Sequence, residues 1–407
     1  MVKVLNLTIL CVSVVGSLSV WFAATAAVAD LISNGLMTSA QGGLLTSAVQ
    51  AGFVVGTLAS ATLGLADRIQ PRRLFATGCC IAGASTLLLP LVEPTGWAAL
   101  GLRAVAGAAM AAVYPVGMKM AATWAKGDLG VLIGILVGSL SLGSASPHLV
   151  NGLIGTLPWT TVYLVAGSLA LAAGALILTF REGEMRFAPT PFRFADIGEA
   201  WRSPQLRLAN LGYLGHMWEL YAMWAWIGAF LQHGPINLQG AKASMLVFLI
   251  IAAGLPGAVL AGLAADRFGR CATAAAAMII SGLCALAIGP LASVAPALAI
   301  AITLVWGFAV VADSAQFSAL AIEIAPRRLT GTMLTIQTCV GFLITIAAIQ
   351  TLPWLLPFAG WNYAFALLAI GPFLGVLAMW KLAALRRTGS VVECGETAAR
   401  TAQHSLS

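Results

Sequence analysis

Long apolar runs alternate with short charged segments along the whole chain. The runs lie near 6–28, 41–63, 74–92, 97–119, 129–152 and 161–180, and then near 207–231, 240–262, 271–292, 297–322, 331–354 and 362–384. Each run is long enough to cross a hydrocarbon core of about 30 Å as an α-helix. The pattern therefore predicts an all-α integral membrane protein with twelve transmembrane helices.

Two polar stretches divide the chain. A charged segment at 181–205 separates the first six runs from the last six, and a polar tail follows residue 385. We expect an N-terminal six-helix bundle at 1–180 and a cytoplasmic linker at 181–205. A C-terminal six-helix bundle at 206–385 and a cytoplasmic tail at 386–407 complete the predicted organisation.

A charged turn occurs twice at matching positions. Asp67-Arg68 follows the second apolar run, and Asp266-Arg267 follows the eighth, 199 positions later. Gly107 falls on Gly307 with an offset of 200. Nearly equal offsets of this kind indicate an internal repeat, so the two bundles are predicted to be pseudo-symmetric copies of one plan.

Composition excludes several classes of protein. Of the 407 residues, 60% are hydrophobic and 9% are charged, whereas soluble globular proteins carry about 25% charged residues. The net charge of +7 lies in clusters between apolar runs, which argues against nucleic acid as a partner. The seven cysteines show no metal-ligand or redox spacing. No phosphate-binding loop and no nucleophile–base pair is found, so we expect neither an ATP-driven pump nor an enzyme, and no metal or cofactor.

The distribution of basic residues predicts the orientation. If the N-terminus is cytoplasmic, 19 of the 21 Lys and Arg residues lie on the cytoplasmic side, the exceptions being Arg103 and Lys242. We therefore expect a multi-pass protein of the cell inner membrane with both termini in the cytoplasm. We also expect it to be a monomer in the lipid bilayer.

The repeated turn carries a family resemblance. The segment from Gly262 to Arg270 matches a G-x-x-x-D-R-x-G-R-R pattern nearly throughout, and the first copy keeps Asp67, Arg68 and a basic end. The segment 100–107 is similar to a fourth-helix arginine motif. By these motifs the chain resembles the major facilitator superfamily over essentially its whole length. The glycine-proline signature of many antiporters in that family is not kept in the segment 138–147, which counts against drug export.

The resemblance implies alternating access, with helices 1, 4, 7 and 10 lining a central cavity. It also implies a gating role for the repeated turn, since an Asp at one helix end can lie against the positive N-terminus of a helix from the other half. The alternative is that these charges only mark cytoplasmic helix ends. The gating candidates are Asp67, Arg68, Arg72, Arg73, Asp266, Arg267 and Arg270.

Apart from those at helix ends, three charges lie inside apolar runs: Arg103, Glu219 and Asp313. A charge near the bilayer centre costs about 2.5–3.5 kcal/mol on insertion scales, so each needs either a structural ion-pair partner or a function. His216 stands three residues before Glu219, close enough on a helix to share a proton. Glu219 is the first candidate for proton coupling, with Asp313 and His216 as the others.

Further polar and aromatic residues share helix faces with these charges. Helix packing and interface belts are the alternative explanation for the rings. The substrate-binding candidates are Arg103, Tyr114, Tyr213, Trp224, Trp226, Trp306, Gln316 and Gln337. His148 and Asn151, one turn apart, fit either a helix–helix bond or a ligand site.

These observations predict a secondary active transporter of a small organic solute, with proton-coupled uptake by symport. The rings favour a planar heteroaromatic substrate such as a riboflavin-like vitamin, and Arg103 favours an organic anion. A proton-antiport exporter of drugs or metabolites is the alternative within the class. A non-transporting membrane sensor is the alternative from another class.

Overall fold

The computed structural model describes residues 2–155, 157–185, 192–326 and 329–404, and the regular elements within them are helices. The first half contains α1 (Val2–Leu18), α2 (Ala23–Ser33), α3 (Ser39–Leu63), α4 (Leu65–Arg68), α5 (Pro71–Leu87), η1 (Leu89–Leu91), α6 (Trp97–Met110), α7 (Tyr114–Ala122), α8 (Leu129–Ile154) and α9 (Trp159–Ile177). The second half contains η2 (Phe194–Asp196), α10 (Glu199–Arg202), α11 (Pro204–His233), α12 (Gly240–Ala252), α13 (Gly254–Phe268), α14 (Arg270–Val294), α15 (Pro296–Ala312), α16 (Ser314–Ile324), α17 (Thr330–Ala364), η4 (Phe365–Ala369) and α18 (Ile370–His404).

Multiple helices are long and apolar enough to cross a membrane. Among the described residues there are nine, or ten if the bent pair α1 and α2 forms one span. The predicted span at 207–231 falls outside this count because polar residues such as Asn210, His216 and Glu219 lower the hydropathy of α11. The last two predicted spans are counted as one, from 330 to 387. The number twelve stays a prediction.

Local sequence signals fix several helix ends. Thr38 and Gln41 form a capping box at the start of α3, and Gly64 ends that helix in the left-handed conformation with φ 62°. Ser203 caps α11, whose first residue is Pro204. These are the turn and cap residues expected between apolar helices.

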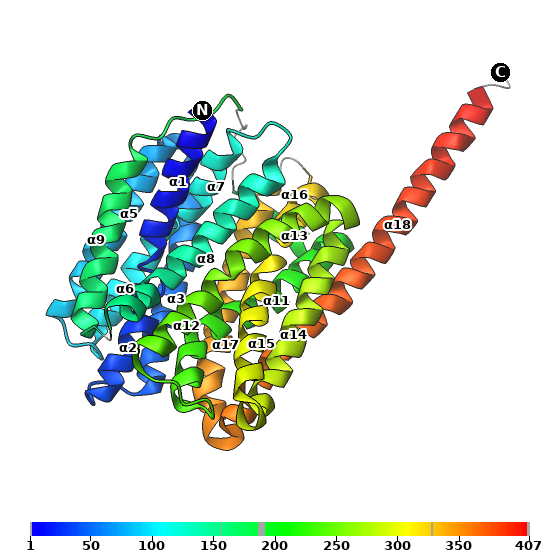
Figure 1. Cartoon of the computed structure of the whole chain (residues 1–407). Helices are drawn as coiled ribbons and strands as arrows, with labels where there is room; N and C mark the ends of the chain where they lie inside the picture. The colour runs from blue at the N-terminus through cyan, green and yellow to red at the C-terminus, as the bar shows by residue number, and fades with distance from the viewer. Residues whose placement is uncertain (1, 156, 186–191, 327–328, 405–407) are drawn as a thin grey trace.

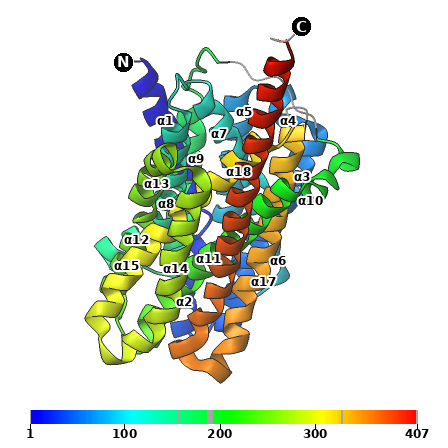
Figure 2. The ribbon, with the colours of Figure 1, turned by 90° about the vertical axis from the view of Figure 1, so that its right-hand side faces the viewer.

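The helices of the two halves stand side by side. Those before α10 lie on one side of the molecule in Figure 1 and those after it on the other, and the view in Figure 2 shows that the long helices run in roughly one direction. The halves meet where α8 packs against α12 and α13, and where α3 packs against α17. We call the end that carries α4 and the α13–α14 junction the motif end, and the opposite end the pocket end.

A glycine contact occurs in both halves. A Cβ atom on Gly107 of α6 would overlap the carbonyl group of Val49 on α3, and one on Gly307 of α15 would overlap that of Ile250 on α12. Small residues of this kind let membrane helices approach closely. The offset of 200 in the sequence thus corresponds to the same packing contact in the structure.

Four of the predicted spans are broken between two α-helices. Helices α1 and α2 are separated by residues 19–22, α12 and α13 by Ala253, α6 and α7 by 111–113, and α15 and α16 by Asp313. The breaks at 111–113 and at Asp313 match under the offset of 200. Broken helices free backbone carbonyl groups that need other partners.

Parts of three predictions fall on residues that the structure does not describe. These are 186–191 in the linker, Arg327 and Arg328 in the loop after α16, and 405–407 in the tail.

Candidate functional site

Glu219 is buried within the second half. Its side chain lies on α11, and the residue is 2% exposed. Oε1 accepts a hydrogen bond of 2.8 Å from Trp306 Nε1 on α15, and Oε2 accepts one of 2.8 Å from Ser281 Oγ on α14. Within the described residues no Lys or Arg pairs with it. We call Glu219, Ser281 and Trp306 the acid cluster. Its two neutral donors, Ser281 and Trp306, can hydrogen-bond the Glu219 carboxyl group whether that group is protonated or ionised.

His216 lies beside Asp313. The distance from His216 Nδ1 to Asp313 Oδ1 is 2.7 Å, and the two side chains are 1% and 3% exposed. Asp313 stands at the break between α15 and α16, so the break presents its side chain to α11. Sequence spacing suggested that His216 shares a proton with Glu219, whereas the structure places its ring against the other acid. Spacing along one helix cannot reveal a closer partner on another helix.

Arg103 donates hydrogen bonds to the backbone at the break in the first predicted span. The residue is fully buried, and its guanidinium donates to Val20 O at 2.8 Å, Trp21 O at 2.7 Å and Leu45 O at 3.4 Å. Two of these carbonyls belong to the segment between α1 and α2, where the helical hydrogen bonds stop. Arg103 therefore joins α6 to two other helices, and all three recorded bonds go to backbone carbonyls.

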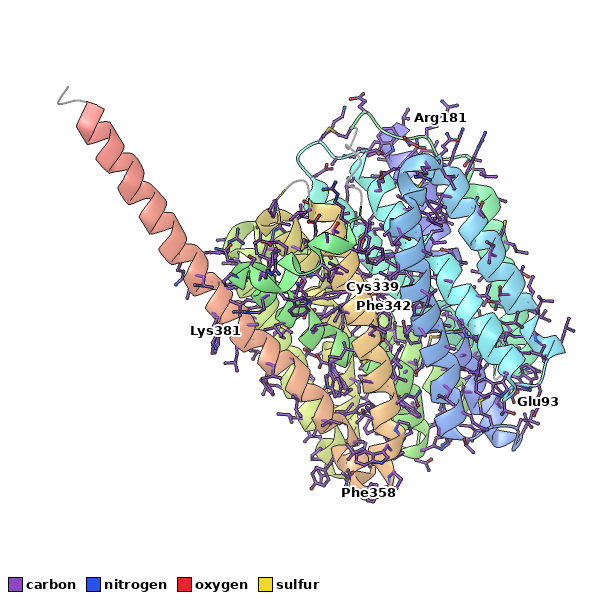
Figure 3. All side chains as sticks on the ribbon, turned by 180° about the vertical axis from the view of Figure 1, so that it is seen from behind. Glu93, Arg181, Cys339, Phe342, Phe358 and Lys381 are labelled. Carbon is purple, nitrogen blue, oxygen red and sulfur yellow. The ribbon has the colours of Figure 1, made fainter. Side chains whose placement is uncertain are left out.

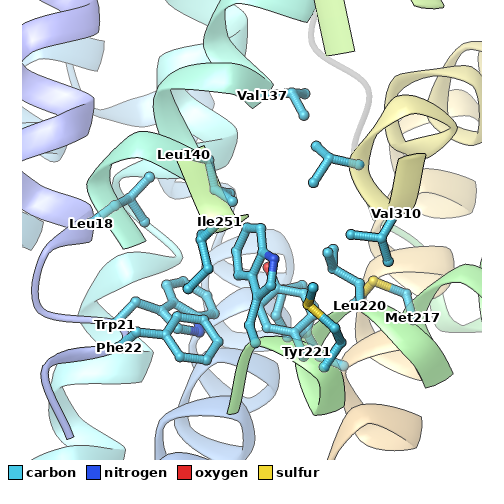
Figure 4. Packing of buried hydrophobic residues seen from close by; sticks show 14 of the residues in the cluster. Leu18, Trp21, Phe22, Val137, Leu140, Met217, Leu220, Tyr221, Ile251 and Val310 are labelled. Carbon is cyan, nitrogen blue, oxygen red and sulfur yellow. The ribbon is translucent and has the colours of Figure 1, made fainter. Parts of the chain in front are cut away.

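Aromatic rings fill the centre where the halves meet. The aromatic cluster consists of Trp21, Phe22, Phe53, Tyr221, Trp224 and Phe342. Ring centroids lie 4.4 Å apart for Phe53 and Phe342, and 5.5 Å apart for Trp21 and Phe342. Figure 4 shows Trp21, Phe22 and Tyr221 close together in this core. Of this cluster only Trp224 was among the sequence candidates for substrate binding.

A pocket of about 230 Å³ opens between the halves at the pocket end. It runs from the exposed rim residues His233 and Gln239 to the buried side chains of His148, Asn151 and Trp224. Its walls come from α2, α3, α8, α11 and α12. We call it the α2–α8–α11 pocket. Trp224 and Trp226 are the substrate candidates that line it.

The polar groups of this pocket are only partly paired. His148 Nε2 lies 3.0 Å from Thr25 Oγ1, and Asn151 Nδ2 donates to Ala26 O at 3.2 Å. Trp226 Nε1 donates to Ile349 O at 2.9 Å. Asn151 Oδ1 and Trp224 Nε1 are buried without a hydrogen-bond partner. His148 and Asn151, which are one helical turn apart in the sequence, both line this pocket.

The other substrate candidates lie away from the pocket. Gln337 donates to Asn210 Oδ1 at 3.0 Å, and Gln316 accepts from Arg270 at 3.3 Å. Trp306 belongs to the acid cluster. The Tyr213 ring lies 6.1 Å from that of His216, and Tyr114 is half-buried at the start of α7.

The two copies of the charged turn differ in their contacts. A Cβ on Gly130, in the first turn of α8, would lie 3.9 Å from Asp266 Oδ1, so Asp266 lies beside the N-terminus of a helix from the other half. Asp67 instead accepts from Lys119 of its own half at 2.7 Å. Such an Asp–helix contact is the geometry that the gating hypothesis requires, and it is seen in the second copy.

The arginines of these turns have further contacts. Arg270 Nε donates to Glu323 at 2.5 Å, and Arg386 reaches the same carboxylate at 3.0 Å. Arg72 donates to Leu178 O at 3.3 Å, and the Arg267 guanidinium lies over the Phe268 ring at 5.4 Å. Arg68 and Arg73 are exposed. All of these contacts lie at the motif end, where Figure 3 also shows Arg181; Glu93 marks the pocket end.

Comparison with protein families identifies the family of this chain. Residues 9–349 match the family model described as Major Facilitator Superfamily. No individual curated protein matches the sequence. The match covers most of both halves and includes the acid cluster, the α2–α8–α11 pocket and both charged turns.

Proposed function

Because this chain belongs to the major facilitator superfamily, whose members are typically membrane transporters and not enzymes, we propose that it moves a small organic solute by secondary active, alternating-access transport. The proposed topology has twelve spans in two six-helix bundles. Helix α11 is long enough for a span at 30 residues, and Gly360, which has a non-helical backbone inside α17, separates the last two. The proposed location is the cell inner membrane, with a monomer whose termini are cytoplasmic.

Proton coupling is supported by one observation: two carboxyl groups lie buried in the second half with exposures of 2% for Glu219 and 2% for Asp313. Ionisable groups in membrane spans are expensive and typically mark ion or proton pathways. The donors to Glu219 among the described residues, Ser281 and Trp306, are neutral, so a proton can serve as its counter-charge. One proton entering with the membrane potential supplies about 2.3 kcal/mol per 100 mV.

Uptake by symport is favoured over export because the fifth span lacks the antiporter signature. The presence of Trp224 and Trp226 in the pocket still supports a planar solute. The hypothesis of an anionic solute loses its basis, since Arg103 is bound to backbone carbonyls. A riboflavin-sized molecule also exceeds what this conformation offers, because about 230 Å³ is below the ~300–1,000 Å³ typical of drug-sized ligands.

The test uses proteoliposomes that enclose a pH-sensitive dye. Tyramine, tyrosol, 4-hydroxyphenylacetate and riboflavin are added in turn, and solute entry is followed together with the internal pH. We expect at least one solute to acidify the lumen with the wild-type protein. With Glu219→Gln we expect that solute still to exchange down its gradient, while the pH change disappears. If the Gln variant retains solute-driven acidification, Glu219 does not couple protons, and Asp313→Asn becomes the next variant.

A non-transporting sensor is the alternative of another class. It would bind a solute without moving it or protons. The same assay separates the two, because a sensor gives neither entry nor a pH change in any variant.

A further inference from the structure

The α2–α8–α11 pocket contains two buried polar atoms that the protein does not satisfy. Asn151 Oδ1 is a hydrogen-bond acceptor on a residue that is 5% exposed, and Trp224 Nε1 is a donor on a residue that is 1% exposed. Buried polar groups are nearly always paired, so unpaired ones at a pocket wall indicate a missing partner. A ligand that fits must therefore donate to Asn151 and accept from Trp224.

The pocket wall also carries an acidic side chain. Asp30 contributes a carboxylate to the wall, where Oδ2 accepts from the Trp159 backbone N–H at 2.9 Å and Oδ1 from Asn34 Nδ2 at 3.0 Å. The described residues that line the pocket include no Lys or Arg. This carboxylate attracts a cationic ligand and repels an anionic one.

The groups that would contact a ligand line one pocket of about 230 Å³. Asn151 Nδ2 is bonded to Ala26 O, and Asp30 stands one turn after Ala26 on the same face of α2. One helical turn is about 5.4 Å long. The indole rings of Trp224 and Trp226 form part of the same lining and offer faces that attract a cation.

We propose that the α2–α8–α11 pocket binds a small organic amine that carries, besides its ammonium group, an oxygen acceptor for Trp224. The ammonium donates to Asn151 Oδ1 in the field of Asp30. This inference deepens the proposed function by naming the class of solute, and it rests on that function only in treating the pocket as a substrate site. Binding itself does not depend on the acid cluster, which contributes no lining residue.

Three compounds of nearly equal size and shape test the charge requirement. Tyramine is a cation, tyrosol is its neutral alcohol and 4-hydroxyphenylacetate is an anion, and each carries a phenol oxygen. Binding to the purified full-length protein is measured by titration calorimetry. We expect tyramine to bind about tenfold more tightly than tyrosol, which corresponds to about 1.4 kcal/mol, and 4-hydroxyphenylacetate to bind most weakly.

Matched variants assign the effect to named atoms. Asp30→Asn is expected to remove the preference for tyramine over tyrosol, whereas Glu93→Gln, an exposed acid at the same end but outside the pocket, should keep it. Trp224→Phe, which keeps a ring but loses the N–H, should weaken all three compounds. Asn151→Asp loses the Nδ2 donor to Ala26 O but keeps an acceptor and adds a charge, so it should strengthen tyramine binding relative to tyrosol. This gain cannot result from misfolding.

The outcomes separate this proposal from the proposed function. No binding of tyramine, equal binding of the anion, or an unchanged preference in Asp30→Asn would overturn the amine site. If tyramine binds as expected but neither it nor any of the other three solutes drives entry or a pH change in proteoliposomes, the site stands and coupled transport is refuted. If riboflavin or the anion drives acidification while tyramine does not bind, coupled transport stands and the amine site is wrong.

Discussion

His216 on α11 and Asp313 at the α15–α16 break lie 2.7 Å apart with almost no exposure to solvent. The pair connects two helices that the sequence separates by nearly a hundred residues. Asp313 stands at the break between α15 and α16, so the contact joins this break to α11.

The first prediction concerns the energy of this pair. Removing one partner of a buried polar pair leaves the other without compensation, which costs about 1–3 kcal/mol, and more when the remaining group is charged. We expect His216→Gln and Asp313→Asn each to lower the thermal stability of the purified protein markedly. The double variant should be destabilised by clearly less than the two single effects added together. Additive effects would show that the two side chains do not interact.

The second prediction concerns Arg103. Arg103→Leu leaves the carbonyls of Val20 and Trp21 without donors, and each buried carbonyl without a donor lowers stability by about 1–3 kcal/mol. We expect a large loss of thermal stability, partly restored in Arg103→Lys, which retains one cationic donor.

A role in substrate binding makes the opposite prediction for Arg103. Arg103→Leu would then fold normally but lose solute binding. Measuring the melting temperature and tyramine binding on the same preparations distinguishes the two roles.

Much of the architecture was predictable, since a long apolar run in a chain with 9% charged residues has few alternatives to a helix. The predicted run at 129–152 corresponds to α8, Leu129–Ile154, and the offset of 200 reappears in the contacts of Gly107 and Gly307. The sequence also singled out Glu219 and Trp224 as candidate site residues, and both are buried.

The partners of these residues were not predictable, because they come from other helices. The sequence spacing suggested Glu219 as the partner of His216, whereas in the structure the side chain of Asp313 lies against His216. The break at residues 19–22 depends on Arg103, which is more than eighty positions away. Asn151 Oδ1 and Trp224 Nε1, which have no hydrogen-bond partner, line one pocket because α8 and α11 lie together at the boundary between the halves.

The third prediction concerns orientation in the membrane. If the termini are cytoplasmic, single cysteines at Asn34 and Lys242, both exposed near the pocket end, should react with an impermeant maleimide in intact cells. A cysteine at Arg73, exposed at the motif end, should react only after the membrane is opened. Labelling of Arg73→Cys in intact cells together with protection at Lys242 would reverse the orientation.

The last prediction follows from the difference between the two charged turns. Asp266 lies beside the first turn of α8, across the boundary between the halves, whereas Asp67 is held by Lys119 within its own half. An acid at a helix N-terminus contributes about 0.3–1 kcal/mol. Losing this contact from one conformation shifts the equilibrium between conformations by about two- to fivefold.

Spin labels on Lys126→Cys in the first half and Leu263→Cys in the second can report this shift, since both side chains are exposed at the motif end. In a background without the native cysteines, Asp266→Asn should raise the population of the longer distance. Asp67→Asn should change it less, because this structure holds Asp67 within one half. Both variants should transport more slowly and still bind solute. If both give the wild-type distance distribution and rate, the charges only mark helix ends. If only Asp67→Asn shifts the distribution, the contact of Asp266 with α8 is not the one that holds the motif end closed.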